Sequence, residues 1–299
     1  DYVAAATSAK LGFVGGTTAG AVTTTGTKLT SQTFTSTGAA NTIGALGVAA
    51  SVTGVTIDAT TKLTTGTITA DGATKLTITG TGAVDINSAA LPATIANIDA
   101  TASSGDVDVT IGDVTAVTAA TSAEATIKTG SGNDEISLAG LVTADHLLLD
   151  AGAGNDVVTL EGSTTNGVLV GASTGVHGDV LEGGTGTDAI SALSAVANAQ
   201  ADVSSAGSIT GFEELTISDA LGQNITPGNY QTGISTVNLA AGSDAAATIA
   251  FAAGDNTVDL KAALAGGTLT VTAAGTATTD SLTINNLGGT SSSGISAIG

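Results

Sequence analysis

Short runs in which apolar and polar residues alternate recur through most of the chain, separated by Gly, Asp, Asn and Ser. This period of two predicts β-strands that have one apolar face and one face of threonine or acid. We therefore expect an all-β protein. The clearest runs are Leu63–Thr69, Leu76–Thr79, Val84–Asn87, Val107–Ile111, Leu215–Ser218, Val237–Leu239, Val258–Leu260, Leu269–Thr272 and Leu282–Asn285.

One alanine-rich segment, residues 190–206, has a helical spacing instead. Its apolar residues are Ile190, Leu193, Val196 or Ala197, and Val203, which suits one short α-helix. The Thr187-Asp188 pair is a suitable N-cap for this helix. We expect at most one or two short helices in the whole chain.

A glycine-rich hexapeptide that ends in aspartate occurs three times between Lys128 and Ser191, each time directly before a short alternating run. The third copy meets every position of the pattern G-G-x-G-x-D-x-U-x, and the other two lack only the first glycine. This pattern predicts a calcium-binding turn followed by one strand of a parallel β-roll. The copies read TGSGNDEIS (Thr129–Ser137), AGAGNDVVT (Ala151–Thr159) and GGTGTDAIS (Gly183–Ser191).

The residue types in these turns suit a calcium site. Glycine adopts the positive φ angles of a tight turn without steric cost, and Ca²⁺ takes six to eight oxygen ligands at ~2.3–2.6 Å. Backbone carbonyls and one carboxylate per turn, taken from two stacked turns, would fill that shell. The carboxylates are those of Asp134, Asp156 and Asp188. The alternative is a set of polar Gly-Asn-Asp turns in a thin β-protein without metal.

After each aspartate, the side chain at the next position but one is expected to point into the roll and to stack on its counterparts. These side chains are Ile136, Val158 and Ile190.

The spacing of the three aspartates is irregular. A continuous roll repeats every nine residues, whereas the interval from Asp134 to Asp156 is more than twice that length and the interval from Asp156 to Asp188 more than three times. Degenerate turns are expected in the gaps, with Asp179, one such repeat before Asp188, as a further ligand. The prediction is a short, irregular calcium-binding β-solenoid with few ions. Asp106, Asp108 and Asp113 form another acidic group, for which a solvated strand face is the preferred interpretation over an ion site.

The composition suits thin layers or coils. The 299 residues include 42 Gly and only 2% aromatic residues, so a thick globular core is not expected. Three parts are predicted: a Thr/Ala/Gly-rich β domain at residues 1–128, the calcium-binding roll at 129–191, and a short helix with a β-rich part at 192–299. In the first part, the phrase at Ile57–Thr60 recurs as Ile98–Thr101. A stacked solenoid and a plain β-sandwich both remain open there.

The charge points to divalent cations as partners. The formal net charge is −20, and neither Lys nor Arg occurs between Lys128 and Lys261. Cations would relieve the mutual repulsion of the acids. Nucleic acid is an improbable partner, because phosphate contacts need Lys and Arg, and binding to a membrane surface through basic helices is excluded for the same reason. There is no cysteine, and no apolar run is long enough to insert into a membrane.

Catalysis is not expected. His146 and His177 are the two histidines of the chain, which limits acid–base chemistry. Residues 171–175 match the nucleophile-elbow pattern G-x-S-x-G, but they lack its strand–turn–helix context on an α/β sheet. Sugar clefts generally need aromatic platforms, and the chain has no Trp.

These turns, the Thr/Ala/Gly-rich strands and phrases such as Ile209–Ile217 resemble the RTX-bearing surface-layer proteins of Gram-negative bacteria. The resemblance implies type I secretion through an uncleaved C-terminal signal, calcium-dependent folding outside the cell and assembly into a two-dimensional lattice. It also implies the metal ligands Gly130, Gly132 and Asp134; Gly152, Gly154 and Asp156; and Gly184, Gly186 and Asp188.

The expected function is therefore a structural one at the cell surface, with copies of the same chain as partners. Cell-envelope polysaccharide is a further partner, bound through a part outside this chain, which begins without methionine and is interpreted as a piece of a longer or processed protein. The main alternative is a calcium-stiffened segment of a secreted adhesin or biofilm-matrix protein. A tail domain of a secreted protease or lipase is a third possibility.

Overall fold

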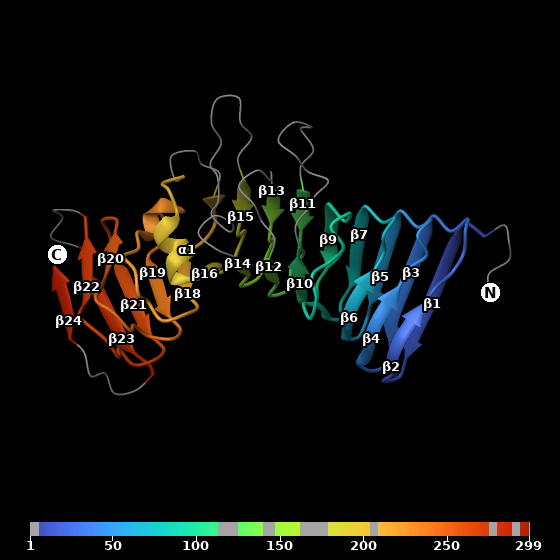
Figure 1. Ribbon diagram of the computed structural model, residues 1–299, viewed down its shortest axis with the longest axis horizontal. Helices are drawn as coiled ribbons and strands as arrows, with labels where there is room; N and C mark the ends of the chain where they lie inside the picture. The colour runs from blue at the N-terminus through green and yellow to red at the C-terminus, as the bar shows by residue number, and fades with distance from the viewer. Residues whose placement is uncertain are drawn as a thin grey trace, which may run out of the picture.

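The computed structural model describes residues 6–112, 125–139, 147–161, 179–203, 209–274, 280–288 and 294–298. In these residues the chain winds as a parallel β-solenoid, with successive coils stacked along the long axis (Figure 1). Each coil in the first two thirds contributes one strand to sheet A and the next strand to sheet B, which explains why odd and even strand numbers separate. The predicted all-β fold with a β-solenoid is confirmed.

The strands of sheet A are β1 (Ser8–Val14), β3 (Ser31–Thr37), β5 (Gly54–Ala59), β7 (Lys75–Gly80), β9 (Asn97–Ser103), β11 (Ala125–Lys128), β13 (Leu147–Asp150), β15 (Val180–Glu182) and β17 (Ile209–Thr210). Sheet B contains β2 (Thr18–Thr23), β4 (Asn41–Gly47), β6 (Leu63–Thr69), β8 (Val84–Ile86), β10 (Val107–Ile111), β12 (Glu135–Leu138), β14 (Val157–Leu160), β16 (Ala189–Ala192), β18 (Glu214–Ile217), β19 (Thr236–Leu239), β21 (Asn256–Leu260) and β23 (Leu282–Asn286). A third sheet, C, is formed by β20 (Ala247–Phe251), β22 (Leu269–Ala273) and β24 (Ile295–Ile298) near the C-terminus.

Columns of aliphatic side chains form the core, because parallel strands in register place like positions one above another. In sheet B, Ile136 pairs with Val158 and Val158 pairs with Ile190, and none of the three is exposed. The predicted stacking of these residues is confirmed. Each such side chain contributes about 1.5–3 kcal/mol on burial. The column in sheet B consists of Ile86, Val109, Ile136, Val158, Ile190, Leu215, Val237, Val258 and the partly buried Ile284.

The length of a coil varies. The stretch of chain between the register partners Val157 and Ala189 is half as long again as the stretch between the register partners Leu63 and Val84. Residues 6–112 form coils of the solenoid and not a β-sandwich. The two copies of the Ile-Asp-Ala-Thr phrase begin in β5 and β9, which lie two coils apart in sheet A. Strand pairing also continues across both predicted domain boundaries, since β11 pairs with β9 and β13, and β16 pairs with β18.

The predicted helix exists but is shorter than the helical pattern. Helix α1 spans Ser194–Ala199, and the preceding residues Ala189–Ala192 continue sheet B as β16. The N-cap is Leu193, so the prediction that Thr187-Asp188 would cap the helix is wrong. The first helical amide, that of Ser194, instead donates to Asp219 Oδ1 of the next coil at 2.6 Å. A short 3₁₀ turn follows at Pro227–Asn229. In the part of the chain described above, no helix is long and apolar enough to cross a membrane.

Tyr230 gives a first testable prediction. Its side chain is fully buried, its hydroxyl has no hydrogen-bond partner among the described residues, and burial raises its pKa. A buried hydroxyl without a partner costs roughly 1–3 kcal/mol. We expect Tyr230→Phe to leave the free energy of unfolding unchanged or to raise it by up to about 1 kcal/mol. Urea denaturation monitored by circular dichroism measures this, and a loss of stability would mean that the hydroxyl has a partner in solution.

Candidate functional site

The three glycine-rich turns stack directly on one another. Each connects a strand of sheet A to the following strand of sheet B: residues 129–134 join β11 to β12, residues 151–156 join β13 to β14, and residues 183–188 join β15 to β16. The intervals between the three aspartates equal the register offsets from Glu135 to Val157 and from Val157 to Ala189. The turns therefore recur once per coil. The expected nine-residue phase, with degenerate turns in the gaps, is replaced by a coil of variable length.

Close packing between coils explains the glycines. A Cβ atom on Gly152 or Gly184 would overlap with the carbonyl oxygen of the glycine one coil earlier, and the same holds for Gly154 and Gly186. These four glycines also have φ angles of +89°, +104°, +140° and +146°, which other residues rarely adopt. Gly130 and Gly132 lie outside that region of φ, and a Cβ on either would collide with the backbone of Ser103 or Asp106. A side chain would thus collide with the neighbouring coil at all six glycine positions, whereas only four of the six glycines have a positive φ.

The carbonyl groups of the turns hydrogen-bond to the neighbouring coil. Gly130 O accepts from the N–H of Ala153 at 2.9 Å, and Gly152 O accepts from the N–H of Thr185 at 3.0 Å. The carbonyl of Thr185 in turn accepts from the N–H of Gly154 at 2.9 Å. Each carbonyl keeps a second lone pair, but the main chain of the turns is already paired between coils. The side chains therefore decide whether the turns suit an ion.

The three aspartates occupy a core position of the solenoid. Glu135 pairs with Asp108 in register, so the residues directly before them, Asp134 and Val107, lie at the same level of neighbouring coils. Val107 pairs with Val84, and Val84 with Leu63, all three fully buried. At this position the core is thus aliphatic in three consecutive coils and carries aspartate in the next three. The side chains of Asp134, Asp156 and Asp188, here called the aspartate column, are 1%, 0% and 0% exposed.

One oxygen of each carboxylate holds neighbouring coils together. Asp134 Oδ1 accepts from the N–H of Val107 at 2.7 Å, Asp156 Oδ1 from the N–H of Asp134 at 2.7 Å, and Asp188 Oδ1 from the N–H of Asp156 at 2.8 Å. The other oxygen, Oδ2, is buried in all three residues and has no hydrogen-bond partner in the described part of the chain. Each carboxylate therefore presents an unused acceptor to the interior.

Burial makes these carboxylates difficult to ionise without a cation. Desolvation raises the pKa of Asp134 and Asp188 above the usual value, and raises the pKa of Asp156 from 3.8 to about 7. The backbone N–H that each carboxylate accepts lowers its pKa in part, as do the Thr129 side chain and the Gly130 backbone for Asp134, and neighbouring carboxylates raise the pKa further. Lysines of the described residues form ion pairs elsewhere, with Asp85, Asp99, Asp150 and Asp259. A proton or a metal ion must neutralise the aspartate column.

A second column of side chains was not recognised in the sequence. Asn133 Oδ1 accepts from the N–H of Asn155 at 2.8 Å, and Asn155 Oδ1 accepts from the N–H of Thr187 at 2.9 Å. Asp106 Oδ1 begins this column by accepting from the N–H of Asn133 at 2.8 Å. These hydrogen bonds join the turns of neighbouring coils. The motif does not predict them, because it allows any residue directly before the aspartate.

The other candidate residues lie elsewhere. Asp179 directly precedes β15 of sheet A, and its Oδ1 accepts from the N–H of Leu147 at 3.3 Å. It therefore lies at the start of a sheet A strand, whereas the aspartate column lies at the start of sheet B strands. Asp108 lies on the outer face of β10, where Asn87 Nδ2 donates to its Oδ2 at 2.8 Å. Asp113, His146, His177 and the G-x-S-x-G segment lie outside the described residues.

The oxygens of the aspartate column are of the type that a hard cation such as Ca²⁺ takes, although the described residues contain no group of three or more His, Cys, Asp or Glu side chains placed to hold one metal ion. The three Oδ2 atoms are buried carboxylate oxygens without a partner among the described residues, and the turn carbonyls keep a second lone pair each. Carboxylate and carbonyl oxygens are the ligands that Ca²⁺ takes. Without a metal, Asp156 would exchange a proton near neutral pH, since burial raises its pKa to about 7.

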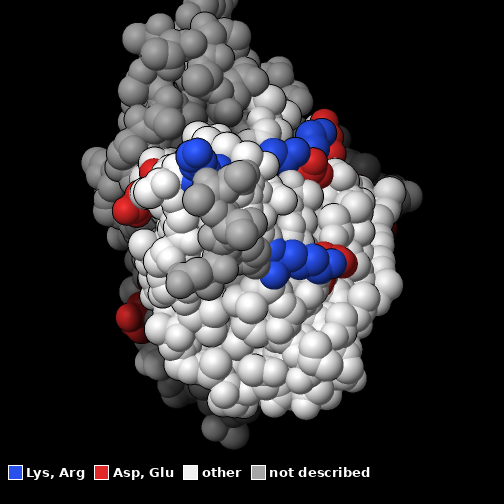
Figure 2. All heavy atoms as spheres, turned by 90° about the vertical axis from the view of Figure 1, so that its right-hand side faces the viewer, with Lys and Arg blue, Asp and Glu red and all other residues white. Residues whose placement is uncertain are grey.

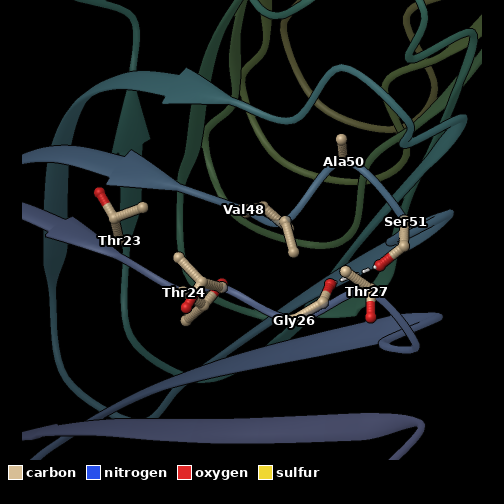
Figure 3. Close-up of a pocket in the computed structure, with 9 residues that line it drawn as sticks. Thr23, Thr24, Gly26, Thr27, Val48, Ala50 and Ser51 are labelled. Atoms are coloured by element: carbon tan, nitrogen blue, oxygen red, sulfur yellow. Dashed lines mark hydrogen bonds between the residues drawn. The ribbon is translucent and has the colours of Figure 1, made fainter. Parts of the chain in front are cut away.

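A hollow of about 240 Å³ elsewhere on the surface is lined by Asp85, Asp106, Asp108 and Glu135 beside Lys62. A larger hollow offers less chemistry. It has a volume of about 610 Å³, lies between the loops after β2 and β4 and is lined by Thr, Gly, Ala, Val and Ser only (Figure 3). The hydroxyl of Ser51 donates to Gly26 O across it at 2.8 Å. It therefore contains no acid or base for catalysis. Seen from the N-terminal end, the molecule is mostly uncharged, with a few lysines beside acids (Figure 2).

No protein-family model, no curated protein and no solved structure matches the chain.

Proposed function

We propose that this chain is the calcium-stabilised β-solenoid of a secreted structural protein that assembles into a layer at the cell surface. A β-solenoid is compatible with a structural repeat protein, and the sequence resembles RTX-bearing surface-layer proteins. The observation that carries the proposal is the aspartate column, in which three buried carboxylates each have one oxygen without a partner in the described part of the chain. The chain's formal charge of −20 gives a second reason to expect cations.

In this proposal, the carboxylates of Asp134, Asp156 and Asp188 would hold calcium while their Oδ1 atoms continue to accept the N–H of the neighbouring coil. Calcium would supply positive charge inside the solenoid and thereby remove the cost of ionising the column. Gly152 and Gly184 keep the turns close enough to stack. Neighbouring coils would then be joined by the ion as well as by the backbone.

Calcium binding would couple folding to export. An ion that binds the folded chain and not the unfolded chain stabilises it by RT ln(1 + [L]/Kd), which is about 2.7 kcal/mol per site at one hundred times Kd. Where calcium is scarce, inside the cell, the chain stays easier to unfold and to export. Where calcium is plentiful, outside the cell, the solenoid becomes rigid and ready to assemble with further copies.

The test is thermal unfolding of the purified chain in EGTA, in millimolar calcium and in millimolar magnesium, together with electron microscopy of the same samples. We expect calcium to raise the melting temperature by at least several degrees, as about 2.7 kcal/mol per site implies, with a smaller effect of magnesium. Two-dimensional sheets in calcium support the layer, and isolated rods in calcium indicate an adhesin or matrix segment. Equal melting temperatures in EGTA and calcium overturn the proposal.

A further inference from the structure

The aspartate column continues for one more coil, beyond the last glycine-rich turn. Ala189 pairs with Glu214, so the residues before them, Asp188 and Glu213, lie at the same level of neighbouring coils. The N–H of Asp188 donates to Glu213 Oε2 at 3.0 Å, just as the N–H of Asp156 donates to Asp188 Oδ1 at 2.8 Å. The N–H of Glu213 also donates to the carbonyl of Asp188 at 3.0 Å. Glu213 therefore makes the contact that an aspartate makes in the earlier coils.

The turn before Glu213 is shorter than the glycine-rich turns. In the coil before, residues 183–188 separate β15 from β16, whereas residues 211–213 alone separate β17 from β18. A turn with half as many residues cannot contain the six-residue motif, and the side chain of glutamate is one methylene longer than that of aspartate. The side chain of Glu213 brings a carboxylate oxygen to the N–H of Asp188.

The two ends of the column differ. At the N-terminal end, Asp134 Oδ1 accepts from the N–H of Val107, whose own side chain is aliphatic, and the nearby carboxylate of Asp106 accepts from the N–H of Asn133 instead. At the C-terminal end, Asp188 is fully buried, its Oδ2 has no partner among the described residues, and the next coil presents a second carboxylate. A cation at this end would lie between the buried Oδ2 of Asp188 and the partly exposed carboxylate of Glu213.

We propose that Glu213 is a further ligand for a divalent cation, shared with Asp188 between the coils of β16 and β18. This inference rests on the proposed function, because it extends the same column of ions. The column then contains four carboxylates and three neighbouring pairs. Calcium is the cation that these oxygen ligands suit.

The experiment compares the unmodified chain with Glu213→Gln and Glu214→Gln by isothermal titration with calcium chloride and by melting temperature. Glutamine keeps an oxygen that accepts the N–H of Asp188, so the variant should fold. Glu214 is the matched control, because it is adjacent, loses the same charge on substitution and instead accepts from Asn238 Nδ2 at 2.6 Å.

We expect Glu213→Gln to bind one calcium ion fewer and to lose roughly a third of the calcium-dependent rise in melting temperature, since one of three pairs is removed. In EGTA it should be at least as stable as the unmodified chain. Glu214→Gln should match the unmodified chain in both stoichiometry and calcium response. If the unmodified chain responds to calcium and Glu213→Gln responds equally, Glu213 is not a ligand and the proposed function still stands. If the unmodified chain does not respond at all, the proposed function fails as well.

Discussion

Replacing Asp156 by asparagine is expected to change the stability of the solenoid in opposite directions with and without calcium. Asparagine keeps the oxygen that accepts the N–H of Asp134 but cannot carry the buried negative charge. In EGTA at pH 8 we expect Asp156→Asn to raise the free energy of unfolding by roughly 1–3 kcal/mol, because removing an unpaired buried charge is favourable. In millimolar calcium it should lower that free energy by about 2.7 kcal/mol or more, because Asp156 belongs to two neighbouring pairs of the column. Urea denaturation in both buffers measures the two values.

Asp150→Asn is the matched control for this experiment. Asp150 ends β13, and its side chain is 36% exposed and paired with Lys128 at 3.4 Å. Exposed ion pairs contribute about 0–1 kcal/mol, so the control should lose little stability, and the same amount in both buffers. If Asp156→Asn shifted stability by the same amount and in the same direction in both buffers, the column would not be a calcium site.

The pH dependence in EGTA provides an independent readout of the same residue. The pKa of Asp156 is about 7 in the folded state against 3.8 ordinarily, so between these values the folded state keeps a proton that the unfolded state has released. The free energy of unfolding should therefore fall as pH rises from about 4 to about 7, by about 1.4 kcal/mol for each pH unit. Above about pH 7 it should stay constant. This slope should be smaller in Asp156→Asn, and calcium should suppress it in the unmodified chain.

Much of the fold was predictable because periodicity reports on which side chains face the core. The run Leu63–Thr69 coincides with β6, and Ile136, Val158 and Ile190 stack as expected. The repeat length was not predictable from the motif, because it depends on connections whose length varies from coil to coil. A nine-residue phase therefore suggested Asp179 as a ligand, although this residue precedes a strand of the other sheet.

The site was only partly predictable for a similar reason. The three aspartates are visible in the sequence, but their placement at the core level of Leu63, Val84 and Val107 follows only from the strand register. Glu213 lies in a turn without the motif, and its alignment with Asp188 depends on the pairing of Ala189 with Glu214. The helix began late because Ala189–Ala192 pair with β14 and β18, and these tertiary contacts override the helical preference of alanine.

The glycine positions of the turns can be separated into two physical requirements by alanine substitution. Gly186 has both a crowded Cβ position and a φ of +146°. We expect Gly186→Ala to lower the free energy of unfolding by more than about 3 kcal/mol, because the new methyl group overlaps with Gly154 O of the coil before and the backbone conformation is strained. Urea denaturation in EGTA measures the loss without any contribution from bound ions.

Three further glycines complete the comparison, each with a different combination of the two requirements. Gly130 is crowded by the carbonyl of Ser103 but lies outside the positive-φ region, Gly254 has a φ of +128° with nothing within 4 Å of its Cβ position, and Gly54 has neither restriction. We expect Gly130→Ala to approach the loss of Gly186→Ala, Gly254→Ala to cost about 1–3 kcal/mol, and Gly54→Ala to have little effect. If Gly254→Ala proved as costly as Gly186→Ala while Gly130→Ala were harmless, backbone conformation and not the close stacking of coils would be the reason for the motif. The opposite order would mean that the glycines are there to let each turn pack directly on the next, which keeps the aspartates of neighbouring coils in register.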